Sequence, residues 1–196
     1  MRLYAGLMTE VQIRISAIQG AKSKPELLSP HLTEEFCFLQ LRMICELIAL
    51  ACLTAHGEVQ GAKSGKLNKE YSADRILNRL QNLHSDFYPK PSKLNSLGPH
   101  NYHVDDIEGP FLTKADLARL YRHCGSKLHR GSLKKLLSSE SLTPVDFTKI
   151  ENWTDEIIAL LDLHRIHLID GKTVIMCHMK RADDGKAHVS IAEAVE

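Results

Sequence analysis

Apolar residues recur every three or four positions along most of the chain, a spacing typical of amphipathic helices. The first such stretch predicts a helix over residues 2–20. A second helix, apolar on nearly every side, is expected from about residue 33 to residue 55. Three more helices are expected to begin at capping residues, after Ser72, after Thr113 and at the Thr143–Pro144 pair. The pattern therefore predicts about five helices, with the second in the centre.

The period changes near the C-terminus, where short apolar and β-branched segments alternate with turn residues. Residues 167–169 and 173–176 flank an Asp-Gly dipeptide, which is typical of a tight β-hairpin. A second turn, Asp-Asp-Gly at 183–185, leads into a further strand at 188–191. These segments predict a small antiparallel meander of three strands.

The resulting fold class is mainly α: a helical bundle of about five helices with a small C-terminal antiparallel three-stranded β-meander. The bundle is expected to occupy residues 1–165, and the meander, residues 166–196, is expected to belong to the same domain. Residues 85–111 interrupt the helical pattern with four prolines and two glycines. We expect them to form a long loop that either has a function or is held in place by its own aromatic side chains.

Composition limits the classes of protein to be considered. The 196 residues are 43% hydrophobic and 25% charged, which is close to the globular average and argues against a disordered chain. Lys and Arg number 25 against 24 Asp and Glu, so the net charge of +1 excludes a protein that coats nucleic acid by bulk positive charge. The most apolar helix contains Arg42 and Glu46, which are costly in the middle of a bilayer, and the N-terminus lacks the apolar run of a signal peptide. We therefore expect a cytoplasmic protein that does not cross a membrane.

Motifs that bind common cofactors are absent from the sequence. It contains no phosphate-binding loop, no dinucleotide-binding glycine pattern, no zinc-binding His-Glu-x-x-His and no nucleophile elbow. The five cysteines form no Cys-x-x-Cys pair. His100 and His103 precede two aspartates but match no metal signature, whereas the neighbouring Tyr102 is available to stack on a base. Neither a cofactor nor a metal is expected.

The fourth predicted helix carries a pair of residues suited to phosphodiester chemistry. Arg122 and His129 are seven positions apart, so their side chains leave the same face if the helix continues through Gly125. A permanently charged Arg stabilises negative charge on a phosphate, while a His that titrates near neutrality moves a proton. Cleavage of RNA by its own 2′-hydroxyl group needs no metal and no cofactor.

Positive charge is concentrated around this pair. Residues 114–135 hold seven Lys and Arg, including Lys127 and Arg130, against a single Asp, and this net charge of +6 is expected to attract phosphates. The alternative is an ordinary solvent-exposed basic helix that ends at His129.

The order Arg122, His123, five further residues and His129 resembles the signature of the HEPN superfamily, an Arg and a polar residue followed at a short interval by a His. Members of that superfamily are helical bundles, commonly dimeric, and many are metal-independent endoribonucleases of toxin–antitoxin or phage-defence systems. The resemblance implies that Arg122 and His129 are catalytic, that His123 supports them, and that the substrate is single-stranded RNA. It also implies a homodimer, with the active site formed across it.

Other HEPN members have lost catalysis, which leaves an alternative function. The chain would then be a non-catalytic scaffold or inhibitor that binds a protein partner or RNA through the basic helix and the edge of the meander.

Arg42 and Glu46 lie one turn apart in the apolar second helix, and both are candidate binding residues. Because buried charges need partners, one possibility is a structural ion pair between them. The other is that Glu46 faces the fourth helix and orients Arg122 or His129, in which case its carboxylate raises the pKa of that His.

Overall fold

The computed structural model describes the chain except for residues 25, 58–69, 100, 130–143, 181–184 and 194–196. The helices of the described part are α1 (Arg2–Ser23), α2 (Pro30–Ala55), α3 (Ala73–Leu83), α4 (Lys114–Leu128) and α6 (Thr148–Leu161). Its strands are β1 (Lys90–Gly98), β2 (Asn101–Asp106), β3 (Leu163–His167), β4 (Thr173–His178) and β5 (His188–Glu193).

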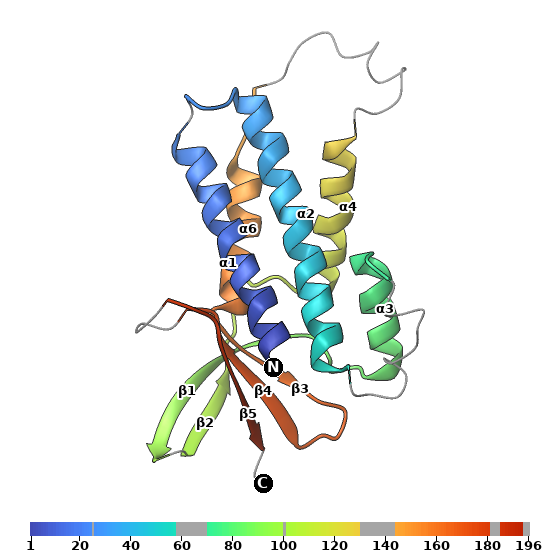
Figure 1. Ribbon diagram of the computed structural model, residues 1–196, viewed down its shortest axis with the longest axis vertical. Coiled ribbons are helices and arrows are strands. Elements are labelled where there is room, and N and C mark those ends of the chain that lie inside the picture. The colour runs from blue at the N-terminus through green and yellow to red at the C-terminus, as the bar shows by residue number, and fades with distance from the viewer. Residues whose placement is uncertain (25, 58–69, 100, 130–143, 181–184, 194–196) are drawn as a thin grey trace.

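The helices form a bundle that stands on one end of the sheet (Figure 1). α2 runs through its middle and packs against α1, α3, α4 and α6. Twelve of its residues are buried, among them the three cysteines Cys37, Cys45 and Cys52, which confirms the prediction of a central apolar helix. α2 is long and apolar enough to cross a membrane. However, 61% of its apolar 18-residue stretch is buried inside the protein.

The sheet is larger than the sequence pattern predicted. Five strands form one curled antiparallel sheet in the order β2-β1-β3-β4-β5. The predicted fold class, a mainly α bundle with a three-stranded meander, is therefore wrong. Because β1 and β2 precede α4 in the chain, the sheet contains strands from both sides of the boundary expected at residue 165.

The two additional strands lie in residues 85–111, which were expected to form a loop. Their prolines and glycines stand where strands tolerate them: Pro91 is at the start of β1, and Gly98, with a φ of +143°, is at the β1–β2 turn. Both strands are mostly polar, β2 is mostly exposed and only Pro91 and Ser92 of β1 are buried, so they lack the alternation of apolar and polar residues by which a half-buried strand is recognised. Backbone hydrogen bonds hold β1 and β2 together, and the pattern of side chains does not reveal these bonds.

The last helix and the strand that follows it also differ from the prediction. α6 begins at Thr148, later than the Thr143–Pro144 pair, and Thr143 lies outside the described residues. It ends at Leu161, and β3 begins at Leu163, inside the segment expected to be helical. The short apolar run here fits either period, so its spacing does not separate helix from strand. By contrast, Thr113 caps α4 as predicted: its hydroxyl oxygen accepts a hydrogen bond from the Asp116 backbone N–H at 3.2 Å.

A buried hydrogen bond joins the bundle to the sheet. The hydroxyl group of Tyr4 in α1 lies 2.6 Å from Nε2 of His164 in β3, and both side chains are fully buried. Nδ1 of His164 lies 2.9 Å from the Leu161 carbonyl oxygen. A carbonyl can only accept, so Nδ1 carries the proton and Nε2 accepts from Tyr4. The imidazole is therefore neutral with both nitrogens satisfied.

Candidate functional site

The C-terminal half of α4 carries the residues predicted to be catalytic. α4 runs through Gly125 and ends at Leu128, so Arg122 lies within the helix, whereas His129 is the capping residue and has an extended backbone. Both side chains are exposed, and neither lines the surface hollow between α2, α4 and α6 or the one between α1 and α2. Arg130 lies outside the described residues.

Gly125 is explained by a neighbour on α2. A Cβ atom at this position would lie 3.1 Å from Nη1 of Arg42, closer than side chains ordinarily approach. The glycine therefore lets the guanidinium group pass close to α4, which offsets its cost of about 1 kcal/mol in a helix interior.

Arg42, Glu46 and Tyr121 form a connected polar group between α2 and α4. The Cζ atom of Arg42 lies 4.1 Å from the centroid of the Tyr121 ring. Nη2 of Arg42 also donates a hydrogen bond to the Tyr121 hydroxyl oxygen at 2.8 Å. The Tyr121 hydroxyl donates to Oε1 of Glu46 at 3.2 Å, and the same oxygen lies 3.5 Å from Nε of Arg42. Burial, followed by the charge of Glu46, raises the pKa of Tyr121.

The sequence left two roles open for Glu46, and the geometry favours the structural one. Glu46 does face α4, but its partners there are Tyr121 and, on its own helix, Arg42. Among the described residues it forms no hydrogen bond or ion pair with Arg122 or His129.

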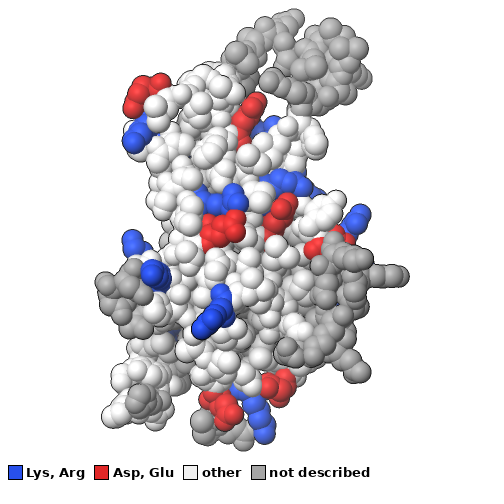
Figure 2. Space-filling model, viewed as in Figure 1, with Lys and Arg blue, Asp and Glu red and all other residues white. Residues whose placement is uncertain are grey.

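Two of the four Lys and Arg side chains of α4 are paired with carboxylates, and a third is bonded to a neutral amide. Arg119 forms an ion pair with Asp116 at 2.7 Å, Lys127 pairs with Glu34 of α2 at 2.8 Å, and Lys114 donates to Gln81 of α3. Among the Lys and Arg residues of this helix, only Arg122 forms neither an ion pair nor a hydrogen bond with a residue that the structure describes. On the face shown in Figure 2, most blue and red atoms likewise lie next to each other. The concentrated positive field that the sequence predicted is thus weakened by these partners.

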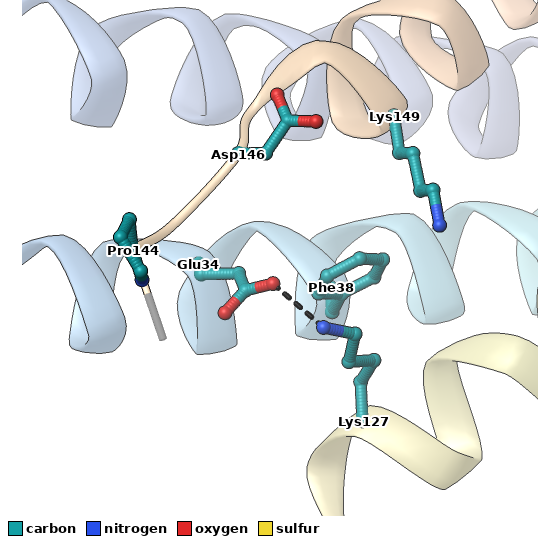
Figure 3. A pocket seen from close by; sticks show the side chains of 6 residues that line it. All are labelled: Glu34, Phe38, Lys127, Pro144, Asp146 and Lys149. Atoms are coloured by element: carbon teal, nitrogen blue, oxygen red, sulfur yellow. Dashed lines mark hydrogen bonds and ion pairs between the residues drawn. The ribbon is translucent and has the colours of Figure 1, made fainter. Parts of the chain in front are cut away.

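A charged hollow of about 150 Å³ lies where α2, α4 and the start of α6 meet (Figure 3). It is lined by Glu34, Phe38, Lys127, Pro144, Asp146 and Lys149. Lys127 reaches from α4 to Glu34, and Lys149 points from the first turn of α6 toward Phe38. The Asp146 carboxylate instead accepts the Thr148 backbone N–H at 2.9 Å.

His123 lies beside this charged hollow. Its ring meets Phe38 edge-on, with 5.3 Å between the ring centroids, and Nε2 is buried without a hydrogen-bond partner among the described residues. Burial, followed by the charges of Lys127 and Lys149, lowers the pKa of His123. The imidazole is therefore neutral at neutral pH.

A second hollow, of about 300 Å³, is mainly apolar and lies between α1 and the beginning of α2. It is lined by Ala17, Gly20, Ala21, Lys24, Leu27, Leu28 and Phe36. Leu27 is 69% exposed and Leu28 is 40% exposed. On α2, Leu32 and Leu39 are 50% and 43% exposed and lie two turns apart on the side that carries Phe36. We call these exposed leucines and the hollow the leucine surface.

The leucine surface was not predicted from the sequence. The signal was present as two consecutive leucines between prolines in the α1–α2 connection, where a solvent-exposed turn ordinarily carries polar residues.

The remaining candidate residues lie on the β1–β2 hairpin. Tyr102 in β2 is 54% exposed, and Nε2 of His103 lies 3.0 Å from Oδ1 of Asp105. His100 is not among the described residues. Within the part of the chain that the structure describes, no group of three or more His, Cys, Asp or Glu side chains is arranged to hold a metal ion.

Comparison with known proteins gave no relative. No protein-family model matches the chain, and no curated protein or solved structure is significantly similar to it. The HEPN resemblance therefore stays a prediction.

Proposed function

We propose that this chain is a non-catalytic interaction protein that binds an amphipathic helix of a partner protein at the leucine surface. The observation that carries the proposal is the exposure of Leu27, Leu28, Leu32 and Leu39 beside an apolar hollow. Contiguous exposed apolar surface is unfavourable in water and commonly marks a binding site for another protein.

The shape of the leucine surface supports a helix as the occupant. The hollow follows the gap between α1 and α2, and small residues, Ala17, Gly20 and Ala21, lie on its α1 side. Small side chains allow a third helix to approach closely and to place a row of apolar residues between the two.

Catalysis by Arg122 and His129 has less support. The two side chains are exposed and neither lines a described hollow, whereas catalytic groups ordinarily act in a recess that limits the access of water.

The proposal is tested by placing charge on the leucine surface. The double variant Leu27→Glu/Leu28→Glu changes side chains that are already partly exposed, and Leu97→Glu, 65% exposed in β1, is the matched control. Burying a leucine contributes about 1.5–3 kcal/mol, so the double variant is expected to raise the partner's Kd at least about tenfold.

Each variant is used to co-purify proteins from the native cell, and the retained partner is then purified and titrated by calorimetry. The expected partner is retained by wild type and Leu97→Glu and lost by the double variant. Retention of every partner by the double variant, or of none by wild type, contradicts the proposal.

A second candidate function is the metal-independent endoribonuclease implied by the HEPN resemblance. It is supported by the continuation of α4 through Gly125 and by the exposure of Arg122 and His129, which leaves both accessible to RNA. In a homodimer with α4 near the two-fold axis, a partner protomer would close the site. Wild type, Arg122→Ala and His129→Ala are incubated with single-stranded RNA and a chelator. Cleavage by wild type alone supports the enzyme, and intact RNA with wild type contradicts it.

A further inference from the structure

The charged hollow between α2, α4 and α6 contains equal numbers of acidic and basic side chains. Two ammonium groups, on Lys127 and Lys149, stand against two carboxylates, on Glu34 and Asp146. An anion entering the hollow meets the two carboxylates, and a cation meets the two ammonium groups. The complementary ligand carries one charge of each sign.

Three of these four groups already have contacts within the protein. Lys127 donates to Oε1 of Glu34 at 2.8 Å and lies over the Phe38 ring at 5.4 Å. Asp146 accepts the backbone N–H of Thr148 at the start of α6. Hydrogen bonds from the Thr148 side chain and then from this N–H lower the pKa of its carboxyl group. These contacts fix the walls of the hollow.

Lys149 and the second carboxylate oxygen of Glu34 remain available. Lys149 forms no hydrogen bond or ion pair with any residue that the structure describes, although its side chain points toward Phe38 (Figure 3). Oε2 of Glu34 has no hydrogen-bond donor in the same described part of the chain. The hollow thus offers an ammonium group that interacts with Asp146 only through its charge, and one carboxylate oxygen without a donor in the described part of the chain.

The rest of the lining is apolar. Pro144 contributes exposed hydrocarbon surface, whereas the Phe38 ring is only 2% exposed, and the volume of about 150 Å³ admits a small molecule rather than a folded segment. His123 beside the hollow adds no charge at neutral pH.

We propose that the charged hollow binds a small zwitterion of the α-amino-acid class, with its carboxylate on Lys149 and its ammonium group on Glu34. Lys127 is a positioning residue that holds Glu34 in place. The apolar side chain of the ligand lies against Pro144, so small neutral amino acids are preferred. This inference does not depend on the function proposed above, because the leucine surface shares no lining residue with the hollow.

Calorimetric titration with alanine tests the proposal. N-Acetylalanine lacks the ammonium group and alaninamide lacks the carboxylate, so each is expected to bind at least tenfold more weakly than alanine. Fluorescence of Trp153, the single tryptophan and one turn from Lys149 in α6, provides a second readout.

Matched variants locate the site. Lys149→Met and Glu34→Gln are expected to weaken alanine binding at least tenfold. Glu35→Gln, at the next position of α2, and Lys172→Met, in the exposed β3–β4 turn, are the controls and are expected to bind as wild type does. Both control side chains are outside the hollow.

Three results would overturn the assignment. The first is a wild-type protein that binds neither alanine nor serine nor valine. The second is N-acetylalanine binding as tightly as alanine, which would reduce the site to a simple anion contact. The third is equal weakening in the site variants and in the controls.

Discussion

The buried contact between Tyr4 and His164 makes a quantitative prediction about stability and pH. Burial is the main cause that lowers the pKa of His164 from its ordinary value of 6.5 to about 4, and the hydrogen bond from Nδ1 to Leu161 opposes this only in part. Between pH 6.5 and 4 the unfolded chain binds a proton that the folded protein does not. The stability contributed by the neutral imidazole is therefore complete above pH 6.5 and is lost as the pH falls toward 4.

The size of the effect follows from the two pKa values. The difference between 6.5 and about 4, at about 1.4 kcal/mol per pH unit, amounts to about 3 kcal/mol for this fully buried group. Of this, about 2 kcal/mol is expected to be lost between pH 7 and pH 5. His56, His123 and His167, whose pKa values are also lowered, add losses of the same sign.

Urea unfolding at pH 7 and pH 5 isolates the contribution of His164. The non-titrating variant His164→Gln is expected to lose about 2 kcal/mol less than wild type between the two pH values, since the other histidines contribute equally to both proteins. Tyr4→Phe, which leaves the histidine in place, is the control: it is less stable by about 1–3 kcal/mol because Nε2 loses its donor, but it keeps the pH dependence.

Equal losses in wild type and His164→Gln would refute this reasoning. If His164→Gln does not fold, NMR titration of the His164 ring in wild type decides the question. A ring that remains neutral at pH 5 supports the assignment, and one that is mostly protonated there contradicts it.

Three further changes test the contacts around α4 by urea unfolding. Gly125→Ala is expected to gain the full helix propensity of about 1 kcal/mol only in an Arg42→Ala background, because Arg42 crowds the new methyl group in wild type; equal gains in both backgrounds would argue against that contact. Tyr121→Phe is expected to cost about 1–2 kcal/mol, since Glu46 loses a donor in a largely buried site, and an unchanged midpoint would show that the hydroxyl adds nothing. Thr113→Ala is expected to cost about 1 kcal/mol through loss of the helix cap, whereas Thr113→Asp, which retains a side-chain acceptor, should restore most of it.

The helices were predictable from sequence because each buries one stripe of side chains, and the stripe repeats with the period of the helix itself. α2 differs from the others because a helix surrounded by neighbours is apolar on most sides, and this pattern also predicted its central place. The cap at Thr113 was also readable, because its partner Asp116 is three residues away in the chain. Relations between residues this close in the chain can be recognised from the sequence.

The strands β1 and β2 were not predictable in the same way. Only two of their side chains are buried, so burial imposes no pattern on them, and the hydrogen bonds that hold the two strands together run between backbone groups. Lys90 and Pro91 of β1 pair with Arg165 and His164, more than 70 residues later, and no local spacing records this.

The same distinction between local and long-range relations applies to the candidate sites. The sequence alone determined that Arg122 and His129 lie near each other along the chain and that α4 is rich in basic residues. Only the tertiary structure decided that Lys127 is paired with Glu34, because Glu34 arrives on another helix. Net charge is a sum over the chain, but the field at a surface depends on which charges become neighbours, and packing alone settles that.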